Sequence, residues 1–307
     1  MKFREEKDSM GKLNVPEDAL YGATTQRALL NFPISDLRFN RTFIKSIAEI
    51  KRCAAETNLE LGTLEKDLAD EIIKAAELVS KGDYDSEFVV DIFQTGSGTS
   101  TNMNTNEVIS NVAIKNIGGI IGSRDPIHPN DHVNKGQSSN DVVPTAIHIA
   151  GCVGIVESLI PGLEKLQKSL EKKSEEFWGV IKTGRTHLQD ATPIRLGQEF
   201  LGYSGQIEES IRRAKSSLNE LSILALGGTA VGTGIGMQKG FSSKVIEKLS
   251  RRFKIQFSES PNHFHSQSTI DAIVASSGNL KTIAVSLMKI GNDIRWLGSG
   301  PRAGIGE

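Results

Sequence analysis

His187 is the side chain in this sequence best suited to proton transfer. It lies in the polar segment 184–191, which reads GRTHLQDA, and its neighbours include Thr186, Gln189 and Asp190. An imidazole titrates near neutral pH, and hydroxyl, amide and carboxylate groups beside it can orient it for general acid or base catalysis. The alternative is a histidine whose hydrogen bonds are only structural.

Two further polar segments combine hydroxyl, amide and glycine groups directly before expected helices. They are QTGSGTST at 94–101, with Ser97, Gly98 and Thr99, and QSSND at 137–141, with Ser138, Ser139 and Asn140. Backbone N–H groups and side-chain donors at the positive end of a helix can bind an anion. Because Ser, Thr and Asn are also the preferred N-cap residues, helix capping alone is the alternative for both segments.

Other residue combinations are poorly suited to metal or nucleotide binding. His128 and His132 are four residues apart, but Pro129 and the Asn-Asp pair between them predict a turn, which argues against a zinc site. The glycine-rich segment 227–236, GGTAVGTGIG, lacks the dinucleotide-loop spacing and follows an expected helix instead of a strand. The segment 94–101 lacks the Lys-Ser/Thr ending of a P-loop.

Long amphipathic helices are the elements that must position these polar segments. Apolar residues recur at steps of three and four along most of the chain, which predicts a mainly α fold. The expected helices cover 39–62, 65–81, 102–117, 141–175 with a kink at Pro161, 193–224 starting at Pro193, and 268–297. The first forty residues are expected to be irregular.

The last of these helices carries a seven-residue repeat. Large residues at 273, 280, 287 and 294 alternate with small ones at 277, 284 and 291, which predicts a close-packed seam in a helical bundle. Helices of about 30 residues are about 45 Å long, more than one compact domain usually buries. We therefore expect an amino-terminal domain at 1–134 and a helical-bundle domain at 135–307, with the bundle shared between subunits.

Composition excludes several classes of protein. A net charge of −1 gives no basic field for nucleic acid or anionic lipid. No uninterrupted apolar run reaches the roughly 18 residues of a membrane span, and the charged start MKFREEKDSM has no secretory h-region. Cys53 and Cys152, the only cysteines, are expected to be buried reduced thiols. These features favour a cytoplasmic protein.

Five segments in order resemble one family, the class II fumarases (fumarate hydratases) of the fumarase/aspartase superfamily. They read TGSGTSTNMNTNEV, HPNDHVNKGQSSNDVVPTA, GRTHLQDATP, LALGGTAVGTG and SLMKIGNDIRWLGSGPRAGIGE, and the resemblance covers essentially the whole chain. It implies reversible addition of water to fumarate, giving L-malate, without a metal or organic cofactor. It also implies a homotetramer with one shared helical core and active sites assembled from three subunits.

The resemblance assigns roles position by position. Ser97, Gly98 and Thr99 match the first substrate loop, Ser138, Ser139 and Asn140 the second, and Thr186 and His187 the third. His187 occupies the place of the proton donor. His128, Pro129, Asn130 and Asp131 match a second, outer dicarboxylate site.

Two alternatives remain open at this point. Aspartases, which remove ammonia from aspartate, typically carry Gln where His187 stands and GAGT where this chain has GSGT, so both positions favour hydration. Ser100 and Thr101 lean toward aspartase. A non-catalytic structural relative is the second alternative, and retention of all three loops argues against it.

The resemblance also implies residues beyond the printed sequence, which stops at Glu307. A loop of the pattern GSSxMPxKxN, which carries the serine assigned as the catalytic base, and a small carboxy-terminal domain would follow. For a protein that ended at Glu307 we expect little hydratase activity.

Overall fold

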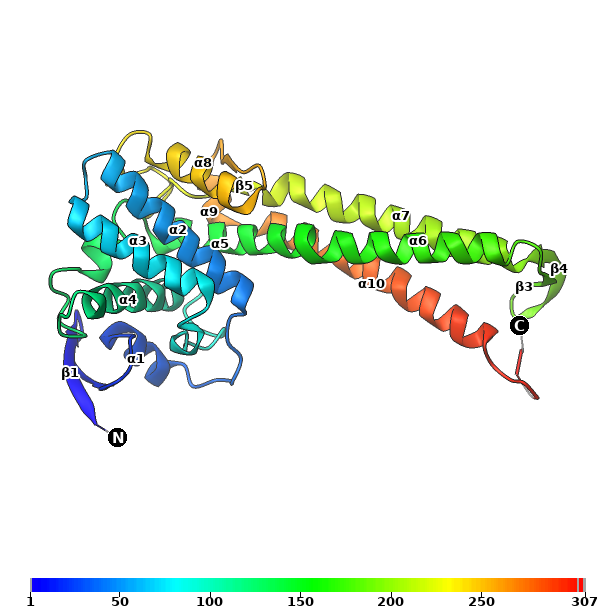
Figure 1. Cartoon of the computed structure of the whole chain (residues 1–307), viewed down its shortest axis with the longest axis horizontal. Helices are drawn as coiled ribbons and strands as arrows, with labels where there is room; N and C mark the ends of the chain where they lie inside the picture. The colour runs from blue at the N-terminus through cyan, green and yellow to red at the C-terminus, as the bar shows by residue number, and fades with distance from the viewer. Residues whose placement is uncertain (1, 303, 306–307) are drawn as a thin grey trace. The chain divides into compact units, whose positions relative to one another are not determined.

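The computed structural model describes residues 2–302 and 304–305 (Figure 1). The described chain is mainly α-helical, which confirms the predicted fold class. It divides into two compact units: unit 1 combines 1–151 with 222–270, and unit 2 combines 152–221 with 271–307. The expected boundary lay at residue 134, whereas this division groups 135–151 and 222–270 with the amino-terminal residues.

Unit 1 contains two small strand pairs and most of the α-helices of the described chain. Its elements are β1 (Phe3–Asp8), β2 (Gly11–Pro16), α1 (Ala23–Asn31), α2 (Arg41–Glu60), α3 (Lys66–Lys81), η1 (Asp85–Glu87), α4 (Thr99–Asn116), η2 (Pro129–Val133), α5 (Ser139–Gly154), β5 (Ile223–Leu224), α8 (Phe241–Phe253), β6 (Ser258–Glu259) and α9 (His263–Ser268). The last residues of α5 already belong to unit 2.

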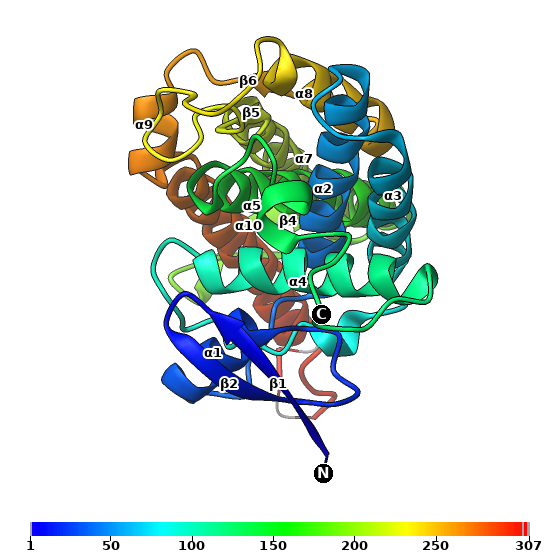
Figure 2. The ribbon, with the colours of Figure 1, turned by 90° about the vertical axis from the view of Figure 1, so that its left-hand side faces the viewer.

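The core of unit 1 forms where α2, α3 and α4 pack together. Figure 2 shows α2 beside α3, with α4 crossing beneath them and the β1–β2 hairpin below α4. Apolar side chains at steps of three and four meet there, including Ile44, Ala48, Ile72, Ala76, Val108 and Val112. Lys51 lies on the same face of α2 and is fully buried, which makes it the exception that needs an explanation.

The first forty residues are not irregular, so that prediction is wrong. β1 and β2 form an antiparallel hairpin, and α1 follows it. The N-cap of α1 is Gly22, which has no side chain to cap the helix. Glu107 on α4 replaces that cap, since its carboxylate accepts the N–H groups of Gly22, Thr24 and Thr25 at 2.9–3.1 Å.

Unit 2 is built from long helices joined by one hairpin. Its elements are η3 (Ile155–Leu159), α6 (Ile160–Glu176), β3 (Ile181–Thr186), β4 (Gln189–Arg195), α7 (Leu196–Leu221) and α10 (Asp271–Leu297). The helix α7 packs against both α6 and α10. α7 begins at Leu196, three residues after the predicted start at Pro193, because Pro193 pairs with Thr183 in the β3–β4 ladder.

The expected kink at Pro161 appears as a π-helical turn. The residues Ile155–Leu159 immediately before α6 form it, and Pro161 is in the first turn of α6. A proline lacks the N–H that would continue the α-helical pattern, and a π-turn is one way in which a long helix accommodates such a break. Cys53 and Cys152 are buried free thiols, as predicted.

The seven-residue seam of α10 was expected in a bundle shared between subunits, and it is not the face of α10 that is buried within this single chain. The residues that α10 buries are Ser276, Ile283 and Ile290. By contrast, Leu280 and Ile294 are each 43% exposed. The repeat therefore identified an apolar stripe correctly, but the stripe lies beside the face that contacts α7.

One continuous helical run, residues 139–176, is long and apolar enough to cross a membrane by length and composition alone. Less than half of its most apolar window is buried within the described chain. Core helices of proteins outside membranes pass the same test, so this run is weak evidence for a span. Every window of about 18 residues in its apolar part includes Asp141 or Glu157.

Candidate functional site

The first candidate loop ends at the amino terminus of α4. Gly98 is the N-cap and has φ of 69°, a left-handed conformation that glycine adopts without strain. The hydroxyl groups of Ser97 and Thr99 are 2.8 Å apart, and Ser97 is exposed. Gln94 holds the start of the helix, because its Oε1 accepts the N–H of Thr101 at 2.9 Å. The loop thus presents two hydroxyl groups at a positive helix end.

The second candidate loop begins α5 with a reciprocal cap. The hydroxyl of Ser138 accepts the N–H of Asn140 at 3.2 Å, while Oδ1 of Asp141 accepts the N–H of Ser138 at 2.9 Å. The other carboxylate oxygen of Asp141 accepts the N–H groups of Gly227 and Thr229 at 3.1 and 3.0 Å. Asp141 therefore ties this loop to the glycine-rich segment 227–236.

The fully buried carboxyl of Asp141 experiences two opposing influences. Burial raises the pKa of Asp141, because the charged form loses its hydration, and the three backbone N–H groups act in the opposite direction. Three donors around one carboxyl group suit the ionised form, which only accepts hydrogen bonds. Asn140, one residue earlier, donates from Nδ2 to the carbonyl oxygen of Ala230 at 2.8 Å and secures the same segment.

The structure brings the first and second candidate loops together in unit 1. Asn102, in the first turn of α4, donates from Nδ2 to the hydroxyl of Ser139 at 3.0 Å. A Cβ added to Gly98 would lie 2.7 Å from Cγ1 of Val143 on α5, so the two helix starts approach too closely for any other residue there. The two candidate loops therefore form one cluster at the starts of α4 and α5.

The third candidate segment is a hairpin in unit 2, not the loop that the sequence suggested. Thr186 ends β3 and pairs with Gln189 of β4, and His187 and Leu188 form the two-residue turn. Their φ angles are 55° and 59°, as a type I′ turn requires. Non-glycine residues in this conformation cost about 1–2 kcal/mol each, and such strain concentrates at functional sites. Both turn side chains are exposed.

The outer-site residues surround one π-helical turn in unit 1. His128 is its N-cap, and Nδ1 of this histidine accepts the N–H groups of Asn130 and Asp131 at 3.3 and 3.1 Å. Pro129 is buried, whereas Asn130 and Asp131 are exposed. The expected turn is therefore present, and Asn130 and Asp131 carry the accessible polar groups.

A buried polar group behind the second loop was missed by the sequence analysis. The amine of Lys51 donates to Oδ1 of Asn134 at 2.7 Å and to Oε1 of Gln137 at 3.1 Å. Burial lowers the pKa of Lys51 to about 7, and the carboxylate of Asp141 partly opposes this shift. The sequence does contain a signal: Lys51 follows Ile44 and Ile47 at helical spacing on an otherwise apolar face.

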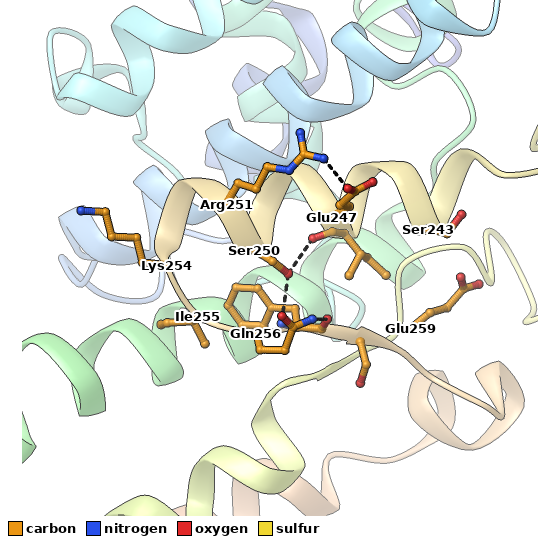
Figure 3. A pocket seen from close by; sticks show the side chains of 11 residues that line it. Ser243, Glu247, Ser250, Arg251, Lys254, Ile255, Gln256 and Glu259 are labelled. Atoms are coloured by element: carbon orange, nitrogen blue, oxygen red, sulfur yellow. Dashed lines mark hydrogen bonds and ion pairs between the residues drawn. The ribbon is translucent and has the colours of Figure 1, made fainter.

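Two other features of the described chain do not contribute to this cluster. Among the described residues, no group of three or more His, Cys, Asp or Glu side chains is placed to hold a metal ion. A pocket of about 680 Å³ lies between α8 and the segment 254–259 (Figure 3). Its charged residues include the ion pair of Arg251 with Glu247, and it contains none of the candidate site residues.

Comparisons with known proteins agree with one another. A family model described as a lyase matches residues 11–307. A protein named fumarate hydratase class II from Rickettsia bellii is 50% identical over 99% of this chain, and the match covers 66% of that protein. A protein named mitochondrial fumarate hydratase from Danio rerio is 52% identical over 99% of this chain, with 60% of that protein covered.

A solved structure shows the same fold. The class II fumarase of Schistosoma mansoni superposes with a TM-score of 0.96 at 41% identity, over 100% of this chain and 67% of the other. The chain thus spans about two thirds or less of the length of the relatives it matches.

Proposed function

The chain belongs to this lyase family, and from that premise we propose that it contributes the larger part of a class II fumarate hydratase. The observation that carries the proposal is the identity of about half of all residues, over 99% of the chain, to relatives named fumarate hydratase. The reaction adds the hydroxyl of water to one alkene carbon of fumarate and a proton to the other, giving L-malate. The reverse reaction removes both.

Substrate binding is assigned to the paired loops of unit 1. Fumarate carries two carboxylates, which only accept hydrogen bonds, and the loops offer hydroxyl donors where α4 and α5 begin. Ser97 and Thr99 on one side and Ser138 and Ser139 on the other are the candidate donors, with Asn140 beside them. Donors fixed in advance stabilise the extra negative charge that a carboxylate gains when the adjacent carbon loses its proton.

His187 is assigned the role of general acid. When malate is dehydrated, the departing hydroxyl must be protonated, and an imidazolium can do so directly or through a water molecule. In the hydration direction the neutral imidazole accepts that proton from water. The β3–β4 turn presents His187 at its tip beside Thr186, an accessible position that a shared active site requires.

The residue at position 187 also favours hydration over ammonia removal. His187, together with Ser97 in GSGT, matches the hydratase pattern, whereas Ser100 and Thr101 match aspartase. The two exceptions face inward, since Ser100 and Thr101 are buried. Ser97 and His187 are exposed, so the hydratase-like positions are the ones that substrate can reach.

A homotetramer with a shared helical core is part of the proposal. Unit 2 exposes large apolar side chains on α10. They include Leu280 and Ile294 of the seven-residue stripe, and Val274 and Met288 beside it. Exposed apolar surfaces of this kind usually bind another protein surface. Helices from neighbouring copies would cover the stripe and bring a hairpin of one copy to the paired loops of another. The outer site at 128–131 is proposed as a second dicarboxylate site.

Location and cofactor use are further proposals. A cytoplasmic location is proposed, although one of the relatives above is named mitochondrial. The chemistry assigned to the hydroxyl groups and to His187 needs neither a metal nor an organic cofactor.

A spectrophotometric assay separates the candidate functions. Fumarate disappearance is followed with the full-length protein, in buffer alone and then with ammonium. Loss in buffer alone, with formation of L-malate, is the expected result. Loss only with ammonium would show an ammonia-lyase, and no loss in either buffer would contradict the proposal.

A further inference from the structure

A chain of hydrogen bonds connects the buried amine of Lys51 to the hydroxyl of Ser139. Nζ of Lys51 donates to Oδ1 of Asn134 at 2.7 Å, and Nδ2 of Asn102 donates to the same oxygen at 3.3 Å. Asn102 then donates to the hydroxyl oxygen of Ser139 at 3.0 Å. The two asparagines and the lysine are buried, whereas Ser139 is partly exposed.

Each bond in this chain has a fixed direction. In its protonated form Lys51 donates and cannot accept, so the amide oxygen of Asn134 faces it. The amide nitrogen of Asn134 then donates to the carbonyl oxygen of Gln137 at 3.3 Å. A reversed Asn102 would place its own oxygen against the oxygen of Asn134, and two acceptors cannot bond. Protonated Lys51 therefore determines that Asn102 presents an N–H to Ser139.

The direction of the last bond matters for the hydroxyl of Ser139. A serine hydroxyl has one proton and two lone pairs. Asn102 occupies one lone pair, so the proton of Ser139 is directed elsewhere, and within the described residues no acceptor for it is recorded. A substrate carboxylate, which only accepts, is the complementary ligand for such a hydroxyl.

We propose that Lys51 acts, through the two asparagines, as a positioning residue that keeps the hydroxyl of Ser139 free to donate to a substrate carboxylate. The proposal rests on the proposed function, because it takes Ser139 to be a substrate-binding group. It explains the donor role of Ser139 by a residue that is buried in unit 1. A buried polar network that only stabilised the fold would not affect dicarboxylate affinity through Ser139.

The unpaired oxygen of Asn102 supports a directional role. Its Oδ1 is buried and has no hydrogen-bond partner among the described residues. A buried acceptor without a partner is costly, by about 1–3 kcal/mol. Asn102 is therefore held in this orientation at an energetic disadvantage, as expected if the direction of its N–H groups is what matters.

A double-mutant cycle tests the connection. Affinity for succinate, an unreactive dicarboxylate, is measured calorimetrically on the intact assembly for Asn102→Leu, Ser139→Ala and the combined variant. Each single change is expected to weaken binding about tenfold, the effect of one hydrogen bond to a charged group. The combined variant should bind about as weakly as Ser139→Ala alone. Losses that multiply to about a hundredfold would overturn the proposal.

Asn111→Leu is the matched control. Asn111 is buried on the same helix, but it donates to the carbonyl oxygen of Leu20 and accepts the N–H of Gly122. This variant should lose stability without losing succinate affinity.

A second variant keeps the test decisive if Asn102→Leu does not fold. Lys51→Gln can present either an oxygen or a nitrogen to Asn134, so the direction is no longer fixed. We expect Lys51→Gln alone to weaken succinate binding. In the Ser139→Ala background the same substitution should cause no further loss of affinity. Wild-type affinity in folded Lys51→Gln would refute the proposal. A different result would refute the proposed function itself: a wild-type protein that binds succinate but does not hydrate fumarate.

Discussion

Replacing Asp141 with Asn should weaken both the fold of unit 1 and the affinity for fumarate. The carboxylate accepts three backbone N–H groups, at 2.9 Å from Ser138 and at 3.1 and 3.0 Å from Gly227 and Thr229. An asparagine has the same shape but only one acceptor oxygen. Its amide oxygen can face Gly227 and Thr229, and its NH2 group then opposes the N–H of Ser138.

The size of the effect follows from these bonds. Losing one hydrogen bond to a charged group, and leaving a buried N–H unpaired, costs about 1.5–3 kcal/mol. The two remaining bonds weaken because the acceptor becomes neutral, which adds about 1 kcal/mol. The relieved cost of burying a charge offsets part of this sum. We therefore expect Asp141→Asn to lower the free energy of unfolding by about 2–4 kcal/mol.

Urea unfolding and fumarate kinetics measured side by side form the assay. Glu107→Gln is the matched control, since Glu107 is also a buried carboxylate that accepts backbone N–H groups in unit 1, but at the start of α1. Both variants should lose similar stability. Only Asp141→Asn should raise KM, because only Asp141 holds the second candidate loop to the segment 227–236. Unchanged stability of Asp141→Asn, or equal KM values in both variants, would refute this reasoning.

The remaining predictions concern the buried lysine and the exposed stripe of α10. The pKa of Lys51 is lowered from 10.5 to about 7 in the fold, so between these values the unfolded chain binds a proton that the folded protein does not, and stability rises with pH. Lys51→Met removes this contribution. Measured by urea titration, the unfolding free energy of the variant relative to wild type should fall by about 1–3 kcal/mol between pH 6 and pH 9. A difference in unfolding free energy that stays constant with pH would contradict the assignment of a proton-binding amine. Leu280→Asp places a charge on the exposed stripe and should reduce the sedimentation mass of the assembly while the helical circular dichroism is kept, whereas Lys281→Asp, at an exposed position beside it, should leave the mass unchanged. An unchanged mass in Leu280→Asp would show that subunits do not meet at this stripe.

Much of the helical fold could be predicted from periodicity, and the failures have identifiable causes. The β1–β2 hairpin was missed because its strands, FREEKD and GKLNVP, are rich in charged residues and show little apolar alternation. The β3–β4 turn was missed because a type I′ turn normally contains Asn-Gly, whereas here His187 and Leu188 adopt the left-handed conformation. The antiparallel pairing of β3 with β4 imposes that conformation against the preference of both residues.

The candidate site shows a similar division. The polar loops around Ser97 and Ser139 could be found from their composition, because donors before a helix are visible in sequence. Their contact through Asn102 could not be found, since it depends on how α4 meets α5. The choice of inner face on α10 was also beyond the sequence, because a repeat of apolar residues does not say which partner covers them. His187 was recognisable as a titratable side chain within a polar segment.

The turnover number of His187→Asn tests the central claim most directly. Asparagine keeps a polar side chain at the hairpin tip, where it tolerates a left-handed conformation, but it cannot carry the proton. We expect kcat for fumarate hydration to fall at least about a hundredfold, the usual contribution of a general acid, with little change in the melting temperature. Turnover equal to wild type in the folded variant would contradict the role of His187 as proton donor.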